Sequence, residues 1–112
     1  MYENLSIFKK ALELNVYLEE AVRNFSRYHK YEIGRELRQK AREILYGIYR
    51  VYFSQNRYGA IMALRDSIEE FKITVYLAKE LKSLRDFKQF EILSKLAVEL
   101  AKQAQGWLGS QK

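Results

Sequence analysis

The stretch from Arg23 to Arg42, RNFSRYHKYEIGRELRQKAR, decides the fold, because the end of one helix, a corner and the start of the next helix follow one another in it. Gly34 stands just after the corner and is the residue there that most cheaply adopts a positive φ angle. Basic side chains recur at steps of three or four on both helices, which places them in rows. These basic residues are Arg23, Arg27, Lys30, Arg35, Arg38 and Arg42. We expect the corner to be a positive surface, either a solvated turn or a docking site for phosphates or an acidic protein.

On both sides of this corner, apolar residues recur at alternating steps of three and four, the period of one helix face. The pattern predicts helices over about residues 4–26, 33–54, 59–82 and 86–106, the last opened by a capping box of Asp86 and Gln89. The residues expected to face the core are Ile7, Ala11, Leu14, Leu18, Ala21, Phe25; Ile33, Leu37, Ala41, Ile44, Ile48, Val51; Ile61, Leu64, Ile68, Phe71, Val75, Ala78; and Phe90, Leu93, Ala97, Leu100, Ala104, Trp107. Because the connections are short, residues 1–112 are expected to form one all-α domain, an antiparallel up-down-up-down four-helix bundle.

The composition narrows the class of protein. A chain of 112 residues is expected to hold one domain, and its 20 Lys and Arg against 14 Asp and Glu leave a net charge of +6, which favours an anionic partner. The absence of Pro leaves long helices uninterrupted, and the absence of Cys excludes disulfides and suits the cytoplasm. No apolar segment is free of charge for long enough to act as a signal peptide or to span a membrane.

Apolar and aromatic residues also lie outside the core stripes. The first helix carries a thin second apolar line, and the second carries an aromatic row in the same sector as the arginines of the corner, at about 100° per residue. Aromatic residues and Arg are enriched at interface cores. The residues expected at an oligomer interface are Leu5, Leu12, Tyr46, Tyr49 and Phe53. The alternative is that the tyrosine rings merely lie over the bundle with their hydroxyl groups in water.

The third helix adds a basic ridge, because Arg65, Lys72 and Lys79 recur every seven residues beside its core stripe. Lys82 follows at the connection to the last helix. Charge that recurs every seven residues is also typical of an exposed helix laced with salt bridges. The ridge therefore points to an anionic partner only in combination with the first corner.

Catalytic and cofactor sites are not expected. His29 is the only histidine, and it lies in a turn flanked by cations, where a general base is hard to keep neutral. A di-iron bundle needs two Glu-x-x-His pairs, and neither a P-loop nor a dinucleotide-binding glycine motif occurs. We therefore expect no catalytic residue, no metal, no cofactor and no small-molecule substrate.

The order of motifs along nearly the whole chain resembles one bacterial family. The motifs are YxNLxIFKKALEL from Tyr2, YHKYxxGxELR from Tyr28, LR with a later Glu69, LAKELK from Leu77, and GWL from Gly106. This pattern resembles the four-helix-bundle proteins that include the accessory variability determinant of diversity-generating retroelements. It is more distantly similar to the bundle proteins encoded in intervening sequences of large-subunit ribosomal RNA genes. The chain departs from the pattern at Gln55-Asn56, where the family has Ala-Asn, and in its aromatic second helix.

The resemblance implies a homopentameric barrel of bundles with no active site of its own. Such a protein binds the reverse transcriptase and its template RNA, or an RNA-DNA hybrid, and supports mutagenic reverse transcription. The positions that match the basic residues of the family are Arg23, Arg27, Lys30, Arg35, Arg38, Arg65, Lys79 and Lys82.

Two functions remain open from the sequence. The first is an oligomeric adaptor that binds the nucleic acid backbone together with a reverse transcriptase. The second is a structural or protein-interaction bundle, of the ribosomal intervening-sequence type or another, whose charges serve solubility and which has no nucleic-acid role.

Overall fold

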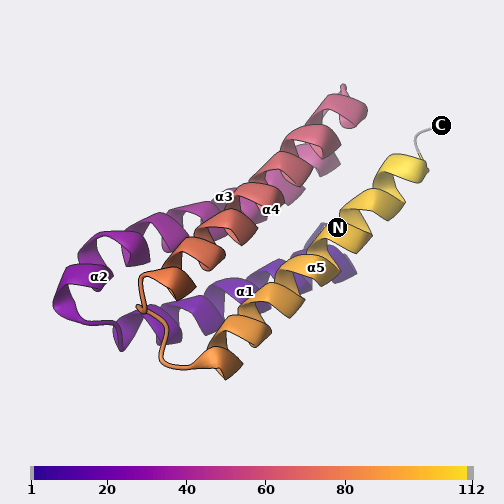
Figure 1. The fold of residues 1–112 in the computed structure, drawn as a ribbon. Coiled ribbons are helices and arrows are strands. Elements are labelled where there is room, and N and C mark those ends of the chain that lie inside the picture. Colours follow the sequence, from indigo (N-terminus) through magenta and orange to yellow (C-terminus); the bar gives the residue numbers. More distant parts are fainter. Residues whose placement is uncertain (1, 111–112) are drawn as a thin grey trace.

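The computed structural model describes residues 2–110 of the chain, and within this range it contains helices and no strand (Figure 1). Four long helices account for most of the chain, with a short 3-10 helix before them and a short α-helix in the first connection. In chain order the elements are η1 (Tyr2–Asn4), α1 (Ser6–Arg23), α2 (Arg27–Tyr31), α3 (Ile33–Phe53), α4 (Arg57–Glu80) and α5 (Phe87–Gly109). None of the described helices is long and apolar enough to cross a membrane.

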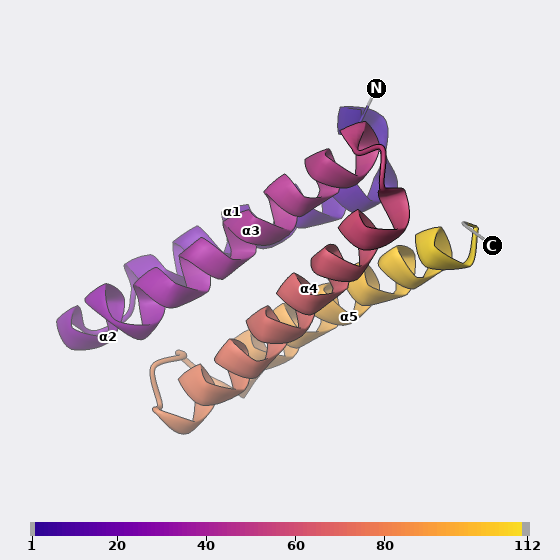
Figure 2. The same ribbon diagram turned by 90° about the horizontal axis from the view of Figure 1, so that it is seen from above.

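The long helices pack side by side in a molecule that measures 44 × 20 × 19 Å. Helix α1 packs against α3 and α5, and α4 packs against the same two helices. Successive long helices run in opposite directions, as Figures 1 and 2 show. The four-helix bundle predicted from the apolar period is therefore confirmed.

This topology gives the bundle two different ends (Figure 2). We call one the α2 end, where α1 finishes, α2 lies, α3 begins, and the connection from α4 to α5 passes. We call the other the η1 end, where η1 lies, α3 finishes, α4 begins and α5 finishes. Segments that are about 50 residues apart in the sequence thus share the α2 end.

The core agrees closely with the predicted stripes. All the residues expected to face inward on α1, α3 and α4 are buried, as are those on α5 before Trp107. Trp107 was predicted to face inward but is only partly buried, since it packs on the margin of the core. Val22, Leu96 and Gly47 are also buried, which the single stripes did not predict.

The first connection differs from the prediction of a simple turn. It contains α2, whose first turn is capped by the Ser26 Oγ, which accepts a hydrogen bond from the His29 backbone N–H at 3.4 Å. Gly34 does not adopt a positive φ angle, because it lies inside α3. A Cβ atom added to Gly34 would stand 2.8 Å from Val22 Cγ1 and 3.1 Å from the carbonyl oxygen of His29. The glycine is required here for close packing and not for a turn.

The bounds of the later helices also differ from those predicted, because local caps decide them. Helix α4 begins at Arg57, two residues early, since the Asn56 side chain accepts a hydrogen bond from the Gly59 N–H at 3.0 Å. Helix α5 does not break at Gly106 but continues to Gly109. The Asp86 Oδ1 caps α5 by accepting from the Gln89 N–H at 2.9 Å, as predicted. The Gln89 side chain accepts in return from the Arg85 N–H and not from that of Asp86.

Candidate nucleic-acid interface

Two segments that are far apart in the sequence meet at the α2 end (Figures 1 and 2), and both carry several basic residues. One group lies on the end of α1, on α2 and on the start of α3, and the other lies around the connection from α4 to α5. The residues of the two groups are Arg23, Arg27, Lys30 and Arg35, and Lys79, Lys82, Arg85 and Lys88. We call the two groups together the basic end. Of the predicted nucleic-acid residues, the bundle thus brings Lys79 and Lys82 to the same end as the first corner.

Most basic side chains of the basic end form no ion pair with a described residue. Among residues 2–110, no carboxylate forms an ion pair with any cation of the first group, and in the second group only Arg85 is paired, with its Nε 3.1 Å from Asp86 Oδ2. Carboxylates do lie at this end, including Glu20, Glu32 and Glu80, which dilute its charge. The basic end nevertheless presents unpaired ammonium and guanidinium groups, and such groups contact phosphates.

Two predicted residues of the first corner are engaged within the protein. The Glu19 carboxylate of α1 accepts from both arginines of α3, with Arg38 Nε at 3.2 Å and Arg42 Nη2 at 2.8 Å. All three side chains are partly exposed, so each pair is worth up to about 1 kcal/mol. These arginines link α1 to α3, and half of their charge is balanced by the shared carboxylate.

A surface groove of about 600 Å³ lies beside these arginines. Its lining joins the basic residues of the first corner to the first ring of the predicted aromatic row. The lining residues are Lys30, Tyr31, Arg35, Arg38, Gln39, Arg42, Glu43 and Tyr46. In this groove the predicted basic and aromatic sets of α3 meet.

The aromatic row of α3 continues from this groove towards the η1 end. Tyr46, Tyr49 and Phe53 are about half exposed, at 54%, 47% and 56%. The Tyr2 ring packs against the row, with its centroid 5.3 Å from that of Tyr49 and 5.9 Å from that of Phe53. The row is therefore a surface cluster of rings, which η1 partly covers.

The two leucines predicted with this row differ in exposure. Leu12 is 42% exposed on the outer side of α1. Leu5 is partly buried and packs against the core. Of this pair, Leu12 offers the larger apolar surface to a partner.

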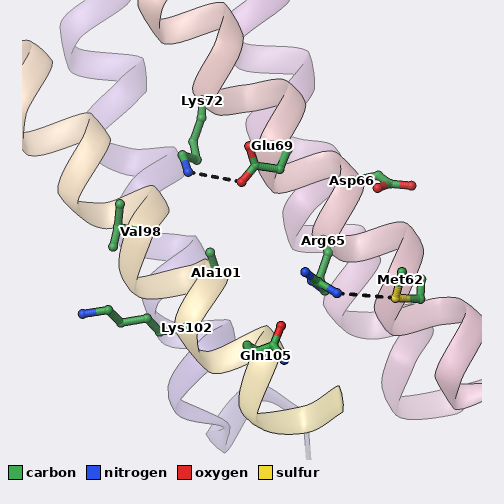
Figure 3. Close-up of a pocket in the computed structure, with 9 residues that line it drawn as sticks. All are labelled: Met62, Arg65, Asp66, Glu69, Lys72, Val98, Ala101, Lys102 and Gln105. Atoms are coloured by element: carbon green, nitrogen blue, oxygen red, sulfur yellow. Dashed lines mark hydrogen bonds and ion pairs between the residues drawn. The ribbon is translucent and has the colours of Figure 1, made fainter. Parts of the chain in front are cut away.

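The predicted basic ridge of α4 does not present a continuous row of free cations, because Lys72 in its middle is paired with a carboxylate (Figure 3). Arg65 lies in a groove of about 330 Å³ between α4 and α5, where its Nη1 stands 3.6 Å from Met62 Sδ. The Nζ of Lys72 forms an ion pair with Glu69 Oε1 at 3.1 Å (Figure 3). Arg65 thus lies towards the middle of α4 and apart from the basic end, whereas Lys79 belongs to it.

The ring of His29 lies on α2 beside that of Tyr28. Its Nδ1 is buried without a hydrogen-bond partner among the described residues, and its ring lies 5.5 Å from that of Tyr28. In the described part of the chain, no group of three or more His, Asp or Glu side chains is placed to hold a metal ion. What this surface offers is charge and exposed rings.

Two exposed rings at this end were not predicted from the sequence. Tyr76 and Phe87 lie on the helices beside Arg85 and Lys88, the basic residues that complete the basic end. The available signal for the rings was a second apolar line on α4, Ile73 and Leu77 at a step of four, outside the core stripe.

Comparison with known protein families and with curated proteins finds no match to this chain.

Proposed function

We propose that this protein is a non-catalytic adaptor that binds the backbone of a nucleic acid through its basic end. The observation that carries the proposal is the meeting of two basic segments at the α2 end, with nearly all of their cations unpaired within the described chain. A protein that neutralises several phosphates gains affinity from the release of counterions, without reading the bases. The basic end has the charge for such binding.

The dimensions of the bundle support the same proposal. Its cross-section is 20 × 19 Å, and the phosphates of one strand recur every 3.4 Å or so along a duplex. A duplex that lies across this end would span roughly six base-pair steps at that spacing, and the phosphates on the side that faces the bundle could be contacted. The cations of the basic end are sufficient to meet them.

We further propose that the nucleic acid is the template RNA, or an RNA-DNA hybrid, of a diversity-generating retroelement, and that reverse transcriptase is a second partner. This part rests on the family resemblance of the sequence motifs. In this proposal the chain forms a homopentamer through the aromatic row and Leu12. The half-exposed rings of Tyr46, Tyr49 and Phe53 support an interface there.

A protein-interaction bundle is the second candidate. The observation that favours it is the exposed apolar surface of α4, where Ile73 and Leu77 stand one turn apart on the same face and are 65% and 47% exposed. Clustered apolar surface is typical of protein interfaces. The two candidates differ in whether the basic end is needed for binding.

The test is the salt dependence of RNA binding by charge-reversal variants of the full chain. We would measure the affinity for a short RNA between about 50 and 200 mM salt, the range over which such binding weakens most visibly. The test variant is Arg23→Glu, Arg27→Glu, Lys30→Glu, which avoids the arginines already paired with Glu19. We expect it to lose most of its affinity and to reduce the log-log salt slope by roughly two, since each phosphate contact contributes about 0.7 to 0.9.

The matched control reverses Arg50, Arg57 and Lys102, which lie towards the η1 end and form no ion pair with another described residue. It changes the net charge by the same amount and is expected to retain most of the affinity and of the slope. Equal losses in the two variants would show that net charge acts without a site. No RNA binding by the wild-type protein at 50 mM salt would leave the protein-interaction bundle as the better candidate.

A further inference from the structure

An exposed aromatic patch lies at the connection from α4 to α5, in the basic end. Tyr76 and Phe87 are 57% and 61% exposed, although each is a large ring. Both pack against Phe90, which is buried: the centroid of its ring lies 5.3 Å from that of Tyr76 and 5.6 Å from that of Phe87. Two solvent-facing rings are thus positioned by a third ring that is fixed in the core.

The ammonium group of Lys79 lies on this patch, and two further lysines lie close to it in the sequence. The Nζ of Lys79 stands 4.8 Å from the centroid of Phe90 and 5.9 Å from that of Tyr76, which is the range of a cation-π contact. Lys82 and Lys88 are exposed beside it, and neither forms an ion pair with a described residue. The backbone of Lys82 is held by two hydrogen bonds that end α4: Lys82 N–H to Lys79 O and Ser83 N–H to Ala78 O, both 3.0 Å.

We propose that Tyr76 and Phe87, supported by Phe90, form a stacking platform for the unpaired bases of a single-stranded nucleic acid, with Lys79, Lys82 and Lys88 at its phosphates. Proteins that bind single strands combine a positive surface with aromatic rings, because every base has a face that stacks. The inference rests on the proposed function and adds to it a preference for single strands. A duplex keeps its bases stacked inside and has none to offer to the rings.

The charge of the patch favours this partner over an apolar protein surface. Covering the platform with apolar side chains would remove the ammonium group of Lys79 from water without giving it an acceptor, which is costly. A single strand presents bases and phosphates at alternate points of the same chain. It therefore satisfies the rings and the lysines together.

The experiment uses the full chain and a 12-nucleotide RNA that carries 2-aminopurine, whose fluorescence is quenched when the base stacks. The test variants are Tyr76→Ala and Phe87→Ala, and Tyr76→Phe is the conservative variant that keeps the ring. The matched control is Tyr58→Ala, which removes a tyrosine of nearly the same exposure, 59%, from the η1 end of the same helix. Binding is measured for the single strand and for its RNA duplex.

We expect each alanine variant to bind the single strand about tenfold more weakly, since loss of one base-aromatic stack costs about 1 to 3 kcal/mol. Quenching should decrease in parallel, duplex binding should be unchanged, and Tyr76→Phe and Tyr58→Ala should behave as wild type. Equal weakening for single strand and duplex, or none for either, would overturn the platform. If the single strand binds normally to both alanine variants but not to the Arg23, Arg27, Lys30 reversal, the platform fails while the proposed function stands.

Two other outcomes of the binding experiments would overturn the platform for different reasons. If the wild-type protein binds neither RNA form at 50 mM salt, the proposed function fails together with the platform. If it binds phosphatidylserine vesicles but no RNA, and Phe87→Ala abolishes that binding, the patch is a membrane contact and the platform is overturned.

Discussion

At the scale of single residues, Gly34 shows how closely the corner is packed. The carbonyl oxygen of His29 would stand 3.1 Å from an added Cβ atom, and Val22 Cγ1 would stand 2.8 Å from it. We expect Gly34→Ala to destabilise the protein, because overpacking of a core costs about 1 to 3 kcal/mol. The gain in helix propensity from Gly to Ala, about 1 kcal/mol, offsets only part of this cost. Urea unfolding of both proteins measures the difference in free energy.

Gly106 provides the control for this substitution. It also lies within a helix, α5, but it is exposed and has nothing within 4 Å of an added Cβ atom. Gly106→Ala should therefore raise stability by about 0.5 to 1 kcal/mol. Stabilisation of the protein by both substitutions would contradict the close packing at Gly34.

The positive φ angle expected at Gly34 occurs instead at Lys82, whose φ is 59°. Lysine adopts this conformation at some cost, because its Cβ crowds the following carbonyl oxygen. The two backbone hydrogen bonds that end α4 there compensate for it. A reading from the sequence assigns positive φ angles to glycine, so a lysine in this position could not be predicted.

At the scale of the helix, the start of α5 depends on the charge of Asp86. The hydrogen bond from the Gln89 backbone N–H, together with that from Arg85, holds the pKa of the Asp86 carboxyl below its usual value of 3.8. A carboxyl whose pKa is lowered by folding stabilises the folded state above its ordinary pKa. That contribution to stability is lost as the pH falls through the pKa that the carboxyl has in the folded protein.

We therefore expect Asp86→Asn, which keeps a capping oxygen but removes the charge, to abolish this contribution. The wild-type protein should be more stable than the variant at pH 7 and at pH 5, and the difference should shrink below about pH 3.8. Urea unfolding of both proteins at pH 7, 5 and 3 tests this, because the remaining carboxylates contribute equally to both. A difference that is constant over this range would show that the charge of Asp86 does not matter.

The helices themselves were predictable, and their ends were less so. The core stripes follow from a period that burial imposes on every turn, so Leu37, Ile44 and Ile48 were identified from spacing alone. Helix ends depend on single hydrogen bonds, such as the one that the His29 N–H donates to the Ser26 Oγ. Many serines stand before helical segments without forming such a bond, so α2 could not be distinguished from a turn.

At the scale of the whole molecule, the candidate site depends on topology more than on any motif. The sequence shows a basic corner near Arg27 and basic residues near Lys82 as separate features. They meet because an antiparallel bundle returns the chain to the same end after two helices. The exposed rings of Tyr76 and Phe87 were not predicted, because apolar lines outside the core stripe were identified only on the first two long helices.

Whether the bundle assembles into an oligomer also depends on the surface of the whole molecule. A stable interface buries roughly 800 Å² on each partner, and a subunit of a closed ring makes two such interfaces. The ring would thus cover roughly 1,600 Å² of the chain, nearly a quarter of its 6959 Å² surface. The outer sides of α1 and α3 are the surfaces on which we propose that this area lies, since they carry Leu12 and the aromatic row.

We expect light scattering after size exclusion to give about 67 kDa, the mass of five chains of 13.4 kDa each. Tyr46→Asp should reduce this mass towards that of a single chain, because it places a charge in the proposed interface. The matched control is Tyr28→Asp on α2, an exposed tyrosine outside that interface, which should stay assembled. A wild-type mass of 13.4 kDa would remove the pentamer but leave the basic end intact, because every residue of that end lies on one subunit.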